Sequence, residues 1–473
     1  MNIKGILYYQ SFFCFPVSFF AFLNILYSSY FDYFLNLESY FITLFISLSV
    51  GFLFYFIGRN SEKKINFHEQ ILLTILIYLI TSSLISVPYY LSNYQIPFIN
   101  ALFESFSGTT GTGFSIFTNI KYLDPTLIIW RSSSQWIGGL FFLIFLILFF
   151  SNSQFGYKLN KMVYTSDKSI NPETNIKKIS LKIFFLYSFL SFIIFVFLSL
   201  SGVRLFNSLN LTMSLISSGG FLPTNTLNQI IKNNTQELIL IASFFISIFN
   251  IFFLYNLFIK KNIIKDHYED ISIAVFAFTL SLILFFSIKD INFLTILISI
   301  LSSLSTSGIT TSNNISNEFT LYLLFLTIVG GSIISNTSGI KFLRFYILLK
   351  ASFIEILKLV RPNNIVNKNI LFSEEKITND NIKISFLIFI SFFISVFLLS
   401  SILLFDNISF ENSFKLSILT LTNTTSSGLY GLTNINFSNL LTSSKIAIII
   451  FMIIAKIELI SFFLIIRKIL FKN

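Results

Sequence analysis

The sequence predicts an all-α polytopic membrane protein, and two observations support this prediction. First, 54% of the 473 residues are hydrophobic and only 11% are charged, whereas soluble domains contain about 25% charged residues. Second, the chain contains many apolar stretches of the roughly 20 residues that a helix needs to cross a bilayer. Phe is strongly over-represented, with 63 residues, and we interpret most of these side chains as lipid-facing.

Ten apolar stretches are predicted to span the membrane. They comprise residues 11–29, 39–58, 70–91, 128–150, 180–201, 236–259, 270–288, 319–358, 383–405 and 445–467. The first stretch lacks a small-residue cleavage motif, so we expect it to remain in the protein as a helix. The stretch 319–358 is long and is interrupted by small and polar residues.

Basic residues predict the orientation of these spans. They form five groups: Arg59, Lys63 and Lys64; Lys158, Lys161, Lys168, Lys177 and Lys178; Lys260, Lys261 and Lys265; Arg361, Lys368 and Lys376; and Arg467, Lys468 and Lys472. The groups fall in alternate loops, so the positive-inside rule places all five, together with both termini, in the cytoplasm. This pattern explains the net charge of +11, and no nucleic-acid partner is expected.

Four loops on the opposite side share a pattern. Each follows an apolar run that is too short to span the membrane but long enough for half a helix. The loops read GTTGTGFS (108–115), SSGGFLP (217–223), STSGITTS (305–312) and SSGLYGL (426–432). An ordinary turn between helices would explain one such loop, but four on one side favour a repeated structural unit.

Non-helical backbone at membrane depth is tolerated only where it is buried in protein or lines a watery cavity. Four short re-entrant helices around one axis would meet this condition, and their loops would present rings of backbone carbonyls. Such rings can replace the hydration shell of an alkali cation. Glycine permits the backbone conformations that point neighbouring carbonyls inward. We therefore interpret the four loops as parts of one cation pathway.

These residues resemble the Trk/Ktr/HKT superfamily of potassium transporters, and within it the TrkH-like branch. The resemblance rests on SVPYYLSN (86–93) followed by ALFESFSGTTGTGFS, then WRSSSQWIGGL (130–140), SLISSGGF (214–221), GGSIISNTSGIKFLRFYILLK (330–350) and KLVRPN (358–363). It implies two extra N-terminal transmembrane helices (1–66) and four pseudo-repeated M1–pore helix–M2 units around one pore. The units comprise residues 67–155, 156–262, 263–365, in which the M2 helix is interrupted, and 366–473.

The resemblance also implies a K⁺ selectivity filter to which each loop contributes backbone carbonyls. The expected donors are Thr112, Gly113, Gly219, Gly220, Ser307, Gly308, Tyr430 and Gly431. Gly431 is preferred for the fourth loop because an apolar residue follows it, as in the first two loops, and Gly428 is the alternative. In this superfamily a glycine at the first filter position accompanies potassium permeation and a serine accompanies sodium preference. Gly113 therefore implies potassium.

Gating residues are expected below the filter. In the family, a glycine-rich segment at this place forms a loop that obstructs the pore, and here the segment contains Ser335, Asn336, Thr337, Ser338 and Gly339. Lys456 stands where the family usually has arginine, and we expect its charge to form a barrier to cations. The alternatives are a plain polar kink for the loop, and pairing with another helix or snorkelling for Lys456. Glu458 lies two residues further on, where a helix would turn it away from Lys456.

The predicted function is potassium uptake through one pore per chain, driven by an inside-negative membrane potential. A sodium-selective or sodium-coupled transporter of the same fold is the alternative. An enzyme is not expected, because the two histidines, His68 and His267, are placed in polar loops and mid-span carboxylates are almost absent. The single cysteine, Cys14, excludes an intramolecular disulfide.

The resemblance further implies a homodimer in a bacterial cytoplasmic (inner) membrane, with a cytoplasmic nucleotide-binding regulatory subunit of TrkA type as a second partner. The sequence carries no phosphate-binding glycine motif, so NAD or ATP would act through that subunit. K⁺ is expected as the transported ion, and no organic cofactor is expected in this chain.

Overall fold

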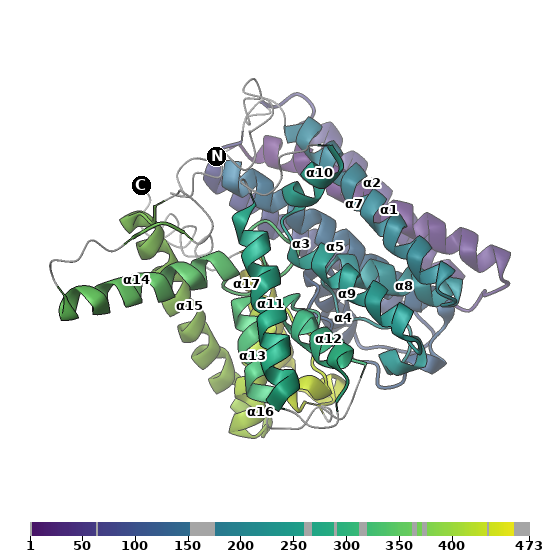
Figure 1. Cartoon of the computed structure of the whole chain (residues 1–473). Coiled ribbons are helices and arrows are strands. Elements are labelled where there is room, and N and C mark those ends of the chain that lie inside the picture. The colour runs from purple at the N-terminus through teal and green to yellow at the C-terminus, as the bar shows by residue number, and fades with distance from the viewer. Residues whose placement is uncertain are drawn as a thin grey trace.

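The computed structural model describes residues 2–62, 65–151, 176–259, 267–287, 291–311, 319–361, 367–370, 376–432 and 435–457. Within these residues the regular structure is helical (Figure 1), apart from one isolated antiparallel bridge. Seven helices are long and apolar enough to cross a membrane: α1 (Ile3–Tyr30), α2 (Leu37–Gly58), α3 (Phe67–Tyr90), α5 (Pro125–Ser151), α7 (Ile176–Leu200), α11 (Tyr268–Ser287) and α15 (Asn379–Leu403). The prediction of an all-α polytopic membrane protein is confirmed.

One stretch that was predicted as a single membrane-spanning helix is divided into two helices. Residues 236–259 form two helices, α9 (Asn234–Ile248) and α10 (Ile251–Ile259), with a bend of 116° between them. The helix breaks because backbone groups on both sides of the junction bond to another segment of the chain. The Ile248 carbonyl accepts a hydrogen bond from the amide of Ser332, and the Ile251 amide donates to the carbonyl of Ile334.

The predicted interruption of the span at 319–358 is present. Residues 330–341 form an irregular segment, the intramembrane loop, between α13 (Thr320–Val329) and α14 (Phe342–Val360). Figure 1 shows α14 lying across the bundle instead of continuing along α13. The last predicted span begins as α17 (Thr442–Lys456), and the rest of that span lies outside the described residues.

The four short apolar runs form the helices α4 (Phe98–Thr110), α8 (Leu205–Ile216), α12 (Phe293–Leu304) and α16 (Phe410–Leu421). At 1.5 Å per residue these helices are about 18–20 Å long, which is shorter than the roughly 30 Å hydrocarbon core. Each must therefore end inside the membrane. The loop that follows needs a protein environment, because lipid cannot satisfy its backbone groups.

The packing of the short helices forms a ring. Each contacts the long helix that precedes it: α4 packs on α3, α8 on α7, α12 on α11 and α16 on α15. Each also contacts a helix from the preceding repeat: α8 packs on α5, α12 on α9, α16 on α13, and α4 on α17. The contact between α4 and α17 joins the last repeat to the first and closes the ring. The residue boundaries given above for the four units stay predictions.

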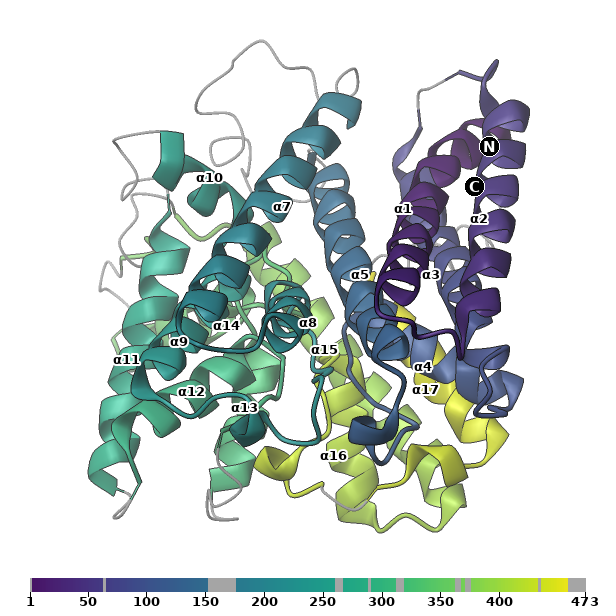
Figure 2. The same cartoon turned by 90° about the vertical axis from the view of Figure 1, so that its right-hand side faces the viewer.

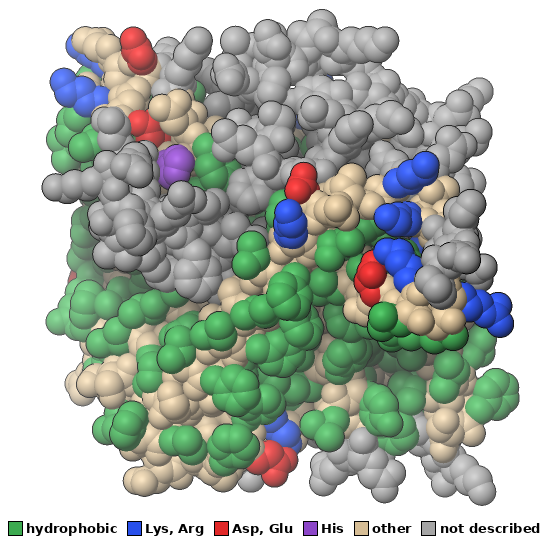
Figure 3. Space-filling view, turned by 90° about the vertical axis from the view of Figure 1, so that its left-hand side faces the viewer, with side chains coloured by type: hydrophobic (Ala, Val, Ile, Leu, Met, Phe, Trp, Pro, Cys, Tyr) green, Lys and Arg blue, Asp and Glu red, His purple; other side chains and the backbone are tan. Residues whose placement is uncertain are grey.

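The two N-terminal helices stand outside this ring. α1 and α2 pack along each other, and α1 also contacts α3 and α5, which belong to the ring (Figure 2). Figure 3 shows hydrophobic side chains gathered mainly over the lower half of one face, and most Lys and Arg side chains visible there lie above them. This distribution fits a lipid-facing belt. Most of the five basic groups lie outside the described residues, so the orientation in the membrane stays a prediction.

Candidate functional site

The loops after the four short helices meet at Gly113, Gly220, Gly308 and Thr425. A methyl group added to Gly113 would lie 2.9 Å from the Cα of Gly220 and 3.0 Å from the Cβ of Thr425. One added to Gly220 would lie 2.3 Å from the Cβ of Thr425 and 2.9 Å from the carbonyl oxygen of Ser307. One added to Gly308 would lie 2.8 Å from the carbonyl oxygen of Thr425. These four residues, the meeting residues, therefore come from four different loops and surround one point.

The structure does not place Gly431 at this point. A methyl group on Gly431 would have the side-chain nitrogen of Lys415 as its nearest neighbour, at 3.4 Å, and no meeting residue among its near neighbours. Tyr430 lies against the end of α12, where its buried hydroxyl donates to Ser303 Oγ at 3.3 Å. The structure thus brings Thr425, and not Gly431, of the fourth loop to the meeting point, while the role of either residue in a filter stays a prediction. Glycine content was a poor guide there, because the chain reaches the meeting point soon after α16 ends at Leu421.

Each meeting residue follows a residue with left-handed backbone by two positions. These four residues, the base residues, are Gly111, Ser218, Thr306 and Asn423, with φ of 76°, 53°, 57° and 46°. Left-handed backbone costs a residue with a side chain about 1–3 kcal/mol. Its recurrence at one position in four loops shows that the loops share a conformation, although their sequences differ.

The meeting residues themselves need small side chains for two different reasons. Gly113 and Gly308 have φ of 77° and 68°, which favours glycine. Gly220 is not among the residues of positive φ, and it is confined by the approach of Thr425. Thr425 also lacks a positive φ, so a β-branched residue is accommodated. Its hydroxyl donates to the Gly113 carbonyl at 2.8 Å and so links the fourth loop to the first.

Hydroxyl groups brace three of the loops around the predicted donor positions. Thr112 Oγ1 lies 2.8 Å from Thr110 Oγ1, Ser307 Oγ lies 3.0 Å from Ser305 Oγ, and in the fourth loop Thr424 Oγ1 lies 2.9 Å from Thr422 Oγ1. In the second loop Gly219 has no side chain, and a methyl group there would lie 2.3 Å from Gln135 Oε1. Gln135 instead accepts a hydrogen bond from the amide of Phe221 at 3.2 Å. Gly219 therefore leaves room for the side chain that holds its loop.

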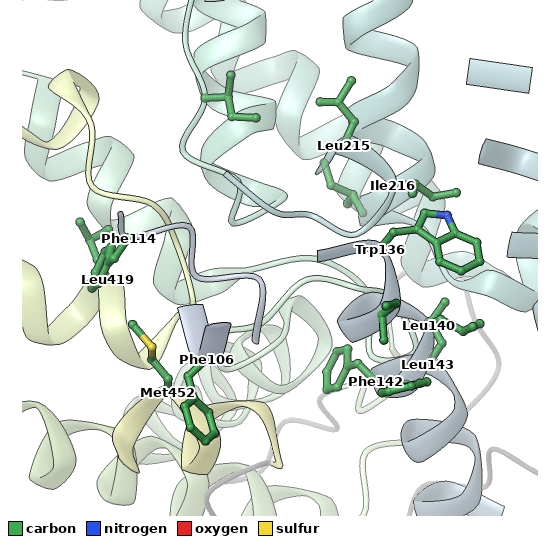
Figure 4. Packing of buried hydrophobic residues seen from close by; sticks show 14 of the residues in the cluster. Phe106, Phe114, Trp136, Leu140, Phe142, Leu143, Leu215, Ile216, Leu419 and Met452 are labelled. Atoms are coloured by element: carbon green, nitrogen blue, oxygen red, sulfur yellow. The ribbon is translucent and has the colours of Figure 1, made fainter. Parts of the chain in front are cut away.

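A cavity of about 810 Å³ opens above the meeting residues. Gly113, Gly220, Gly308 and Thr425 all line it, together with hydroxyl and amide side chains of the segments that follow them. Hydrophobic side chains from α4, α5, α8, α16 and α17 pack around the loops (Figure 4). The meeting point thus lies below a polar cavity and is surrounded by packed hydrophobic side chains.

A buried ion pair beside this cavity was not predicted from the sequence. Arg131 Nε on α5 donates to Glu104 Oε1 on α4 at 2.8 Å, and both side chains are at most 1% exposed. Glu104 also accepts from the Ile116 amide at 2.8 Å, and Arg131 donates to Ser115 Oγ at 2.9 Å. The Arg131 guanidinium lies 4.2 Å from the ring centre of Phe221. The pair therefore supports the segments that follow the first two meeting residues.

The intramembrane loop lies directly beneath the base residues. Ser218 Oγ donates to the Asn336 carbonyl at 2.9 Å, the Ser338 amide donates to Thr306 Oγ1 at 3.2 Å, and Asn423 Nδ2 donates to Ser338 Oγ at 3.2 Å. Three of the four base residues thus bond to this loop. All of the predicted gating residues Ser335, Asn336, Thr337 and Ser338 are buried, and Gly339 takes a φ of 84°.

Lys456 lies below Gly111, the base residue that does not bond to the intramembrane loop. Its Nζ lies 3.7 Å from the position of a methyl group on Gly111, and it donates to the Asn336 carbonyl at 3.3 Å. The side chain is 1% exposed, so it does not snorkel to the surface. Its ammonium group lies 4.2 Å from the ring centre of Phe142. Glu458, the carboxylate two residues after Lys456 in the sequence, lies outside the described residues.

A second buried lysine, Lys341, was missed by the sequence reasoning. Its Nζ donates to the Ser335 carbonyl at 3.3 Å, and to the carbonyl and hydroxyl of Thr337. It also lies 5.6 Å from the ring centre of Phe142, so both lysines contact one aromatic ring. Lys341 lies at the end of the glycine-containing segment and precedes a further apolar stretch, and this position was the signal in the sequence that could have indicated a buried lysine. The intramembrane loop therefore has two ammonium groups bonded to its carbonyls.

Comparison with known proteins identifies the family of this architecture. Residues 36–300, more than half of the chain, match the TrkH family, described as cation transport protein. An uncharacterized cation transporter of Methanocaldococcus jannaschii is 28% identical over 384 residues, which are 77% of this chain and 78% of that protein. The Trk system potassium uptake protein TrkG of Escherichia coli is 26% identical over 352 residues, 71% of this chain and 72% of that protein.

Among solved structures, the fold matches the crystal structure of the potassium transporter TrkH from Vibrio parahaemolyticus. The TM-score is 0.85 over 98% of each chain, at 19% sequence identity. The family and the structural neighbour are transporters and not enzymes. The chain is therefore a multi-pass membrane protein that belongs to the TrkH family of cation transport proteins.

Proposed function

We propose that the chain takes up potassium ions through a selectivity filter at the point where the four loops meet. The observation that carries the proposal is the convergence of Gly113, Gly220, Gly308 and Thr425, each two residues after a base residue. Because three of these residues have no side chain, an ion on this axis would meet backbone. Carbonyl rings can replace the hydration shell of potassium. Potassium is also the ion in the name of the TrkG relative.

The carbonyl donors of this proposed filter are Thr112 and Gly113, Gly219 and Gly220, Ser307 and Gly308, and Thr424 and Thr425. The fourth pair replaces the pair Tyr430 and Gly431 expected from the sequence. Support for the exchange comes from the equal spacing of base and meeting residues in all four loops. The negative potential of a cell interior would then drive entry by about 2.3 kcal/mol per charge per 100 mV.

The proposed gate is the intramembrane loop together with Lys456. The loop crosses below the base residues and bonds to three of them, so an ion that leaves the filter would meet Asn336 and Ser338. The Lys456 ammonium adds a repulsive charge at the same level. Opening would require both to move or to lose their contacts.

A sodium-conducting transporter is the second candidate, and Thr425 is the observation that favours it. Its hydroxyl lies at the meeting point and bonds to the Gly113 carbonyl at 2.8 Å, which takes up an oxygen that potassium would use. By the resemblance, serine at the first filter position accompanies sodium preference, and Thr425 brings a hydroxyl to the proposed fourth position. The ratio of potassium to sodium permeability therefore decides between the candidates.

The test is cation uptake into proteoliposomes with an inside-negative potential, measured in potassium and in sodium. The proposal expects potassium uptake, and expects Gly113→Ser to lower the potassium/sodium ratio. Gly431→Ser is the matched control, since it introduces the same side chain at a glycine outside the meeting point. Uptake of sodium in preference to potassium would select the second candidate. An unchanged ratio in Gly113→Ser would remove Gly113 from the filter.

The assembly is also proposed on the strength of the resemblance. It comprises a homodimer with both termini in the cytoplasm, in the cytoplasmic membrane, and a nucleotide-binding regulatory subunit of TrkA type. Relatives named as parts of a Trk system support this arrangement. The mass of the detergent-purified protein, with and without the co-expressed subunit, tests it.

A further inference from the structure

Two chain breaks inside the membrane meet at one place. The break between α9 and α10 lies against the first half of the intramembrane loop, and the two segments exchange backbone hydrogen bonds. The Ser332 amide donates to the Ile248 carbonyl at 3.0 Å, and the Ile251 amide donates to the Ile334 carbonyl at 3.0 Å. The second and third repeats are thus joined at the loop proposed as the gate.

The first turn of α11 supplies two neighbouring carboxyl groups to this place. Glu269 accepts hydrogen bonds with both oxygens, from Ser332 Oγ at 3.0 Å and from the Ile333 amide at 3.0 Å. Asp270 accepts from the Asn250 amide at 2.8 Å. Both side chains are at most 2% exposed. One carboxyl group therefore holds the intramembrane loop, and its neighbour holds the α9–α10 junction.

We propose that Glu269 is a positioning residue that clamps the intramembrane loop in its place below the filter. The loop segment that it holds, Ser332–Ile333, lies only three to six residues before Asn336 and Ser338, which contact the base residues. The inference deepens the proposed gate and rests on it. Removal of the carboxyl oxygens would leave a buried hydroxyl and a buried amide without these acceptors, which favours other loop positions.

The same clamp connects α10 to the loop. Asn250 directly precedes α10, and its amide donates to Asp270. Further along, within α10, the Asn256 side chain lies 2.9 Å from His267 Nε2. His267 Nδ1 in turn lies 3.7 Å from Asp270 Oδ2. His267 is buried, contrary to the polar loop position expected from the sequence. A displacement of α10 would therefore reach Glu269 through the adjacent residue.

The test measures loop exposure directly. Cys14 is the single cysteine of the chain, so a Cys14→Ala background allows one reporter thiol, introduced as Ser335→Cys. The rate at which a small water-soluble methanethiosulfonate modifies this thiol is measured in the purified full-length protein. Three backgrounds are compared: Glu269 retained, Glu269→Gln and Glu269→Ala. Glu38→Gln is the matched control, because Glu38 also lies in the first turn of a membrane helix but is exposed.

We expect the modification rate to rise about tenfold in Glu269→Ala, the population change that follows loss of one buried hydrogen bond. Glu269→Gln retains one acceptor and should fall between Glu269→Ala and the unchanged protein, while Glu38→Gln should have no effect. An unchanged rate in Glu269→Ala overturns the proposal. If Glu269→Ala does not fold, Ser332→Ala removes only the hydroxyl donor, and an unchanged rate there overturns it equally.

A parallel flux measurement separates this proposal from the function on which it rests. A higher modification rate accompanied by higher basal potassium flux supports both the clamp and the gate. A higher rate with unchanged flux supports the clamp but removes the intramembrane loop from the gate. An unchanged rate in a folded, conducting protein rejects the clamp and leaves the filter standing.

Discussion

Replacement of Glu104 by glutamine tests whether one buried ion pair holds the filter loops. Glu104 accepts from Arg131 Nε and from the Ile116 amide, each at 2.8 Å, and it is fully buried. Glutamine retains an oxygen for one donor but removes the negative charge, so Arg131 becomes a buried cation without its counter-charge. Removal of one partner from a buried pair costs about 3–5 kcal/mol. We expect a loss of unfolding free energy of that size.

The assay uses the two tryptophans of the chain, Trp130 and Trp136, which flank Arg131 on α5. Their fluorescence reports denaturant unfolding of the detergent-solubilised protein close to the altered site. A double-mutant cycle with Arg131→Met isolates the pair, because the double variant leaves neither charge alone. We expect a coupling energy of about 2 kcal/mol, within the usual range for contacting residues.

The control for this cycle is Glu411→Gln, which removes the carboxylate from the exposed pair with Lys415. Exposed pairs are screened by solvent, so no measurable change in stability is expected. A coupling energy below about 0.5 kcal/mol between Glu104 and Arg131 would refute the reasoning, since contacting residues normally exceed that value. Flux should fall with stability, because Ser115 and Ile116, which bond to the pair, lie two and three residues after Gly113.

Three further predictions concern the proposed pathway. Lys456→Met should raise cation flux by about 30-fold, since the Lys456 charge and an ion roughly 8 Å away repel by about 2 kcal/mol at an effective dielectric of 20. Lys358→Met, which changes a lysine in an exposed ion pair, is the control. Unchanged flux in Lys456→Met would exclude an electrostatic barrier at this lysine. Gly220→Ala should abolish flux, because the new methyl group would lie 2.3 Å from Thr425 Cβ, and added Thr425→Gly should restore part of it. Thr425→Gly alone should raise the potassium/sodium permeability ratio measured by reversal potential, and a lower ratio would contradict the role given to its hydroxyl.

The positions of most membrane-spanning helices were predictable, because long apolar stretches have few alternatives in a bilayer. The break between α9 and α10 was not, since the residues around Asn250 are apolar and continue a helical pattern. What interrupts the helix is supplied from far away in the sequence, by Ser332, Ile334 and Asp270. A local pattern cannot show that a distant segment will compete for backbone hydrogen bonds.

The candidate site was predictable to the level of its loops but not of every residue. Gly113, Gly220 and Gly308 were found because glycine marks left-handed backbone or close approach, which are local requirements. The fourth loop satisfies the same geometry with Thr425, and the search for glycine led to Gly431 instead. The pair of Glu104 with Arg131 was missed because it joins two helices, although each charge within an apolar segment was a visible signal.

The base residues explain how an intramembrane loop with many polar side chains is held below the meeting point. Ser218, Thr306 and Asn423 each take a left-handed backbone that costs about 1–3 kcal/mol. Each also forms a side-chain hydrogen bond to the loop, and a buried hydrogen bond contributes about 0.5–1.5 kcal/mol. A glycine base would avoid the strain but would lose the bond, and a loop made of glycine would offer no side chain to Asn423. The polar side chains of the base residues and those of the intramembrane loop are thus complementary. Gly111 is the one base residue without a side chain, and it is the one that faces the Lys456 ammonium.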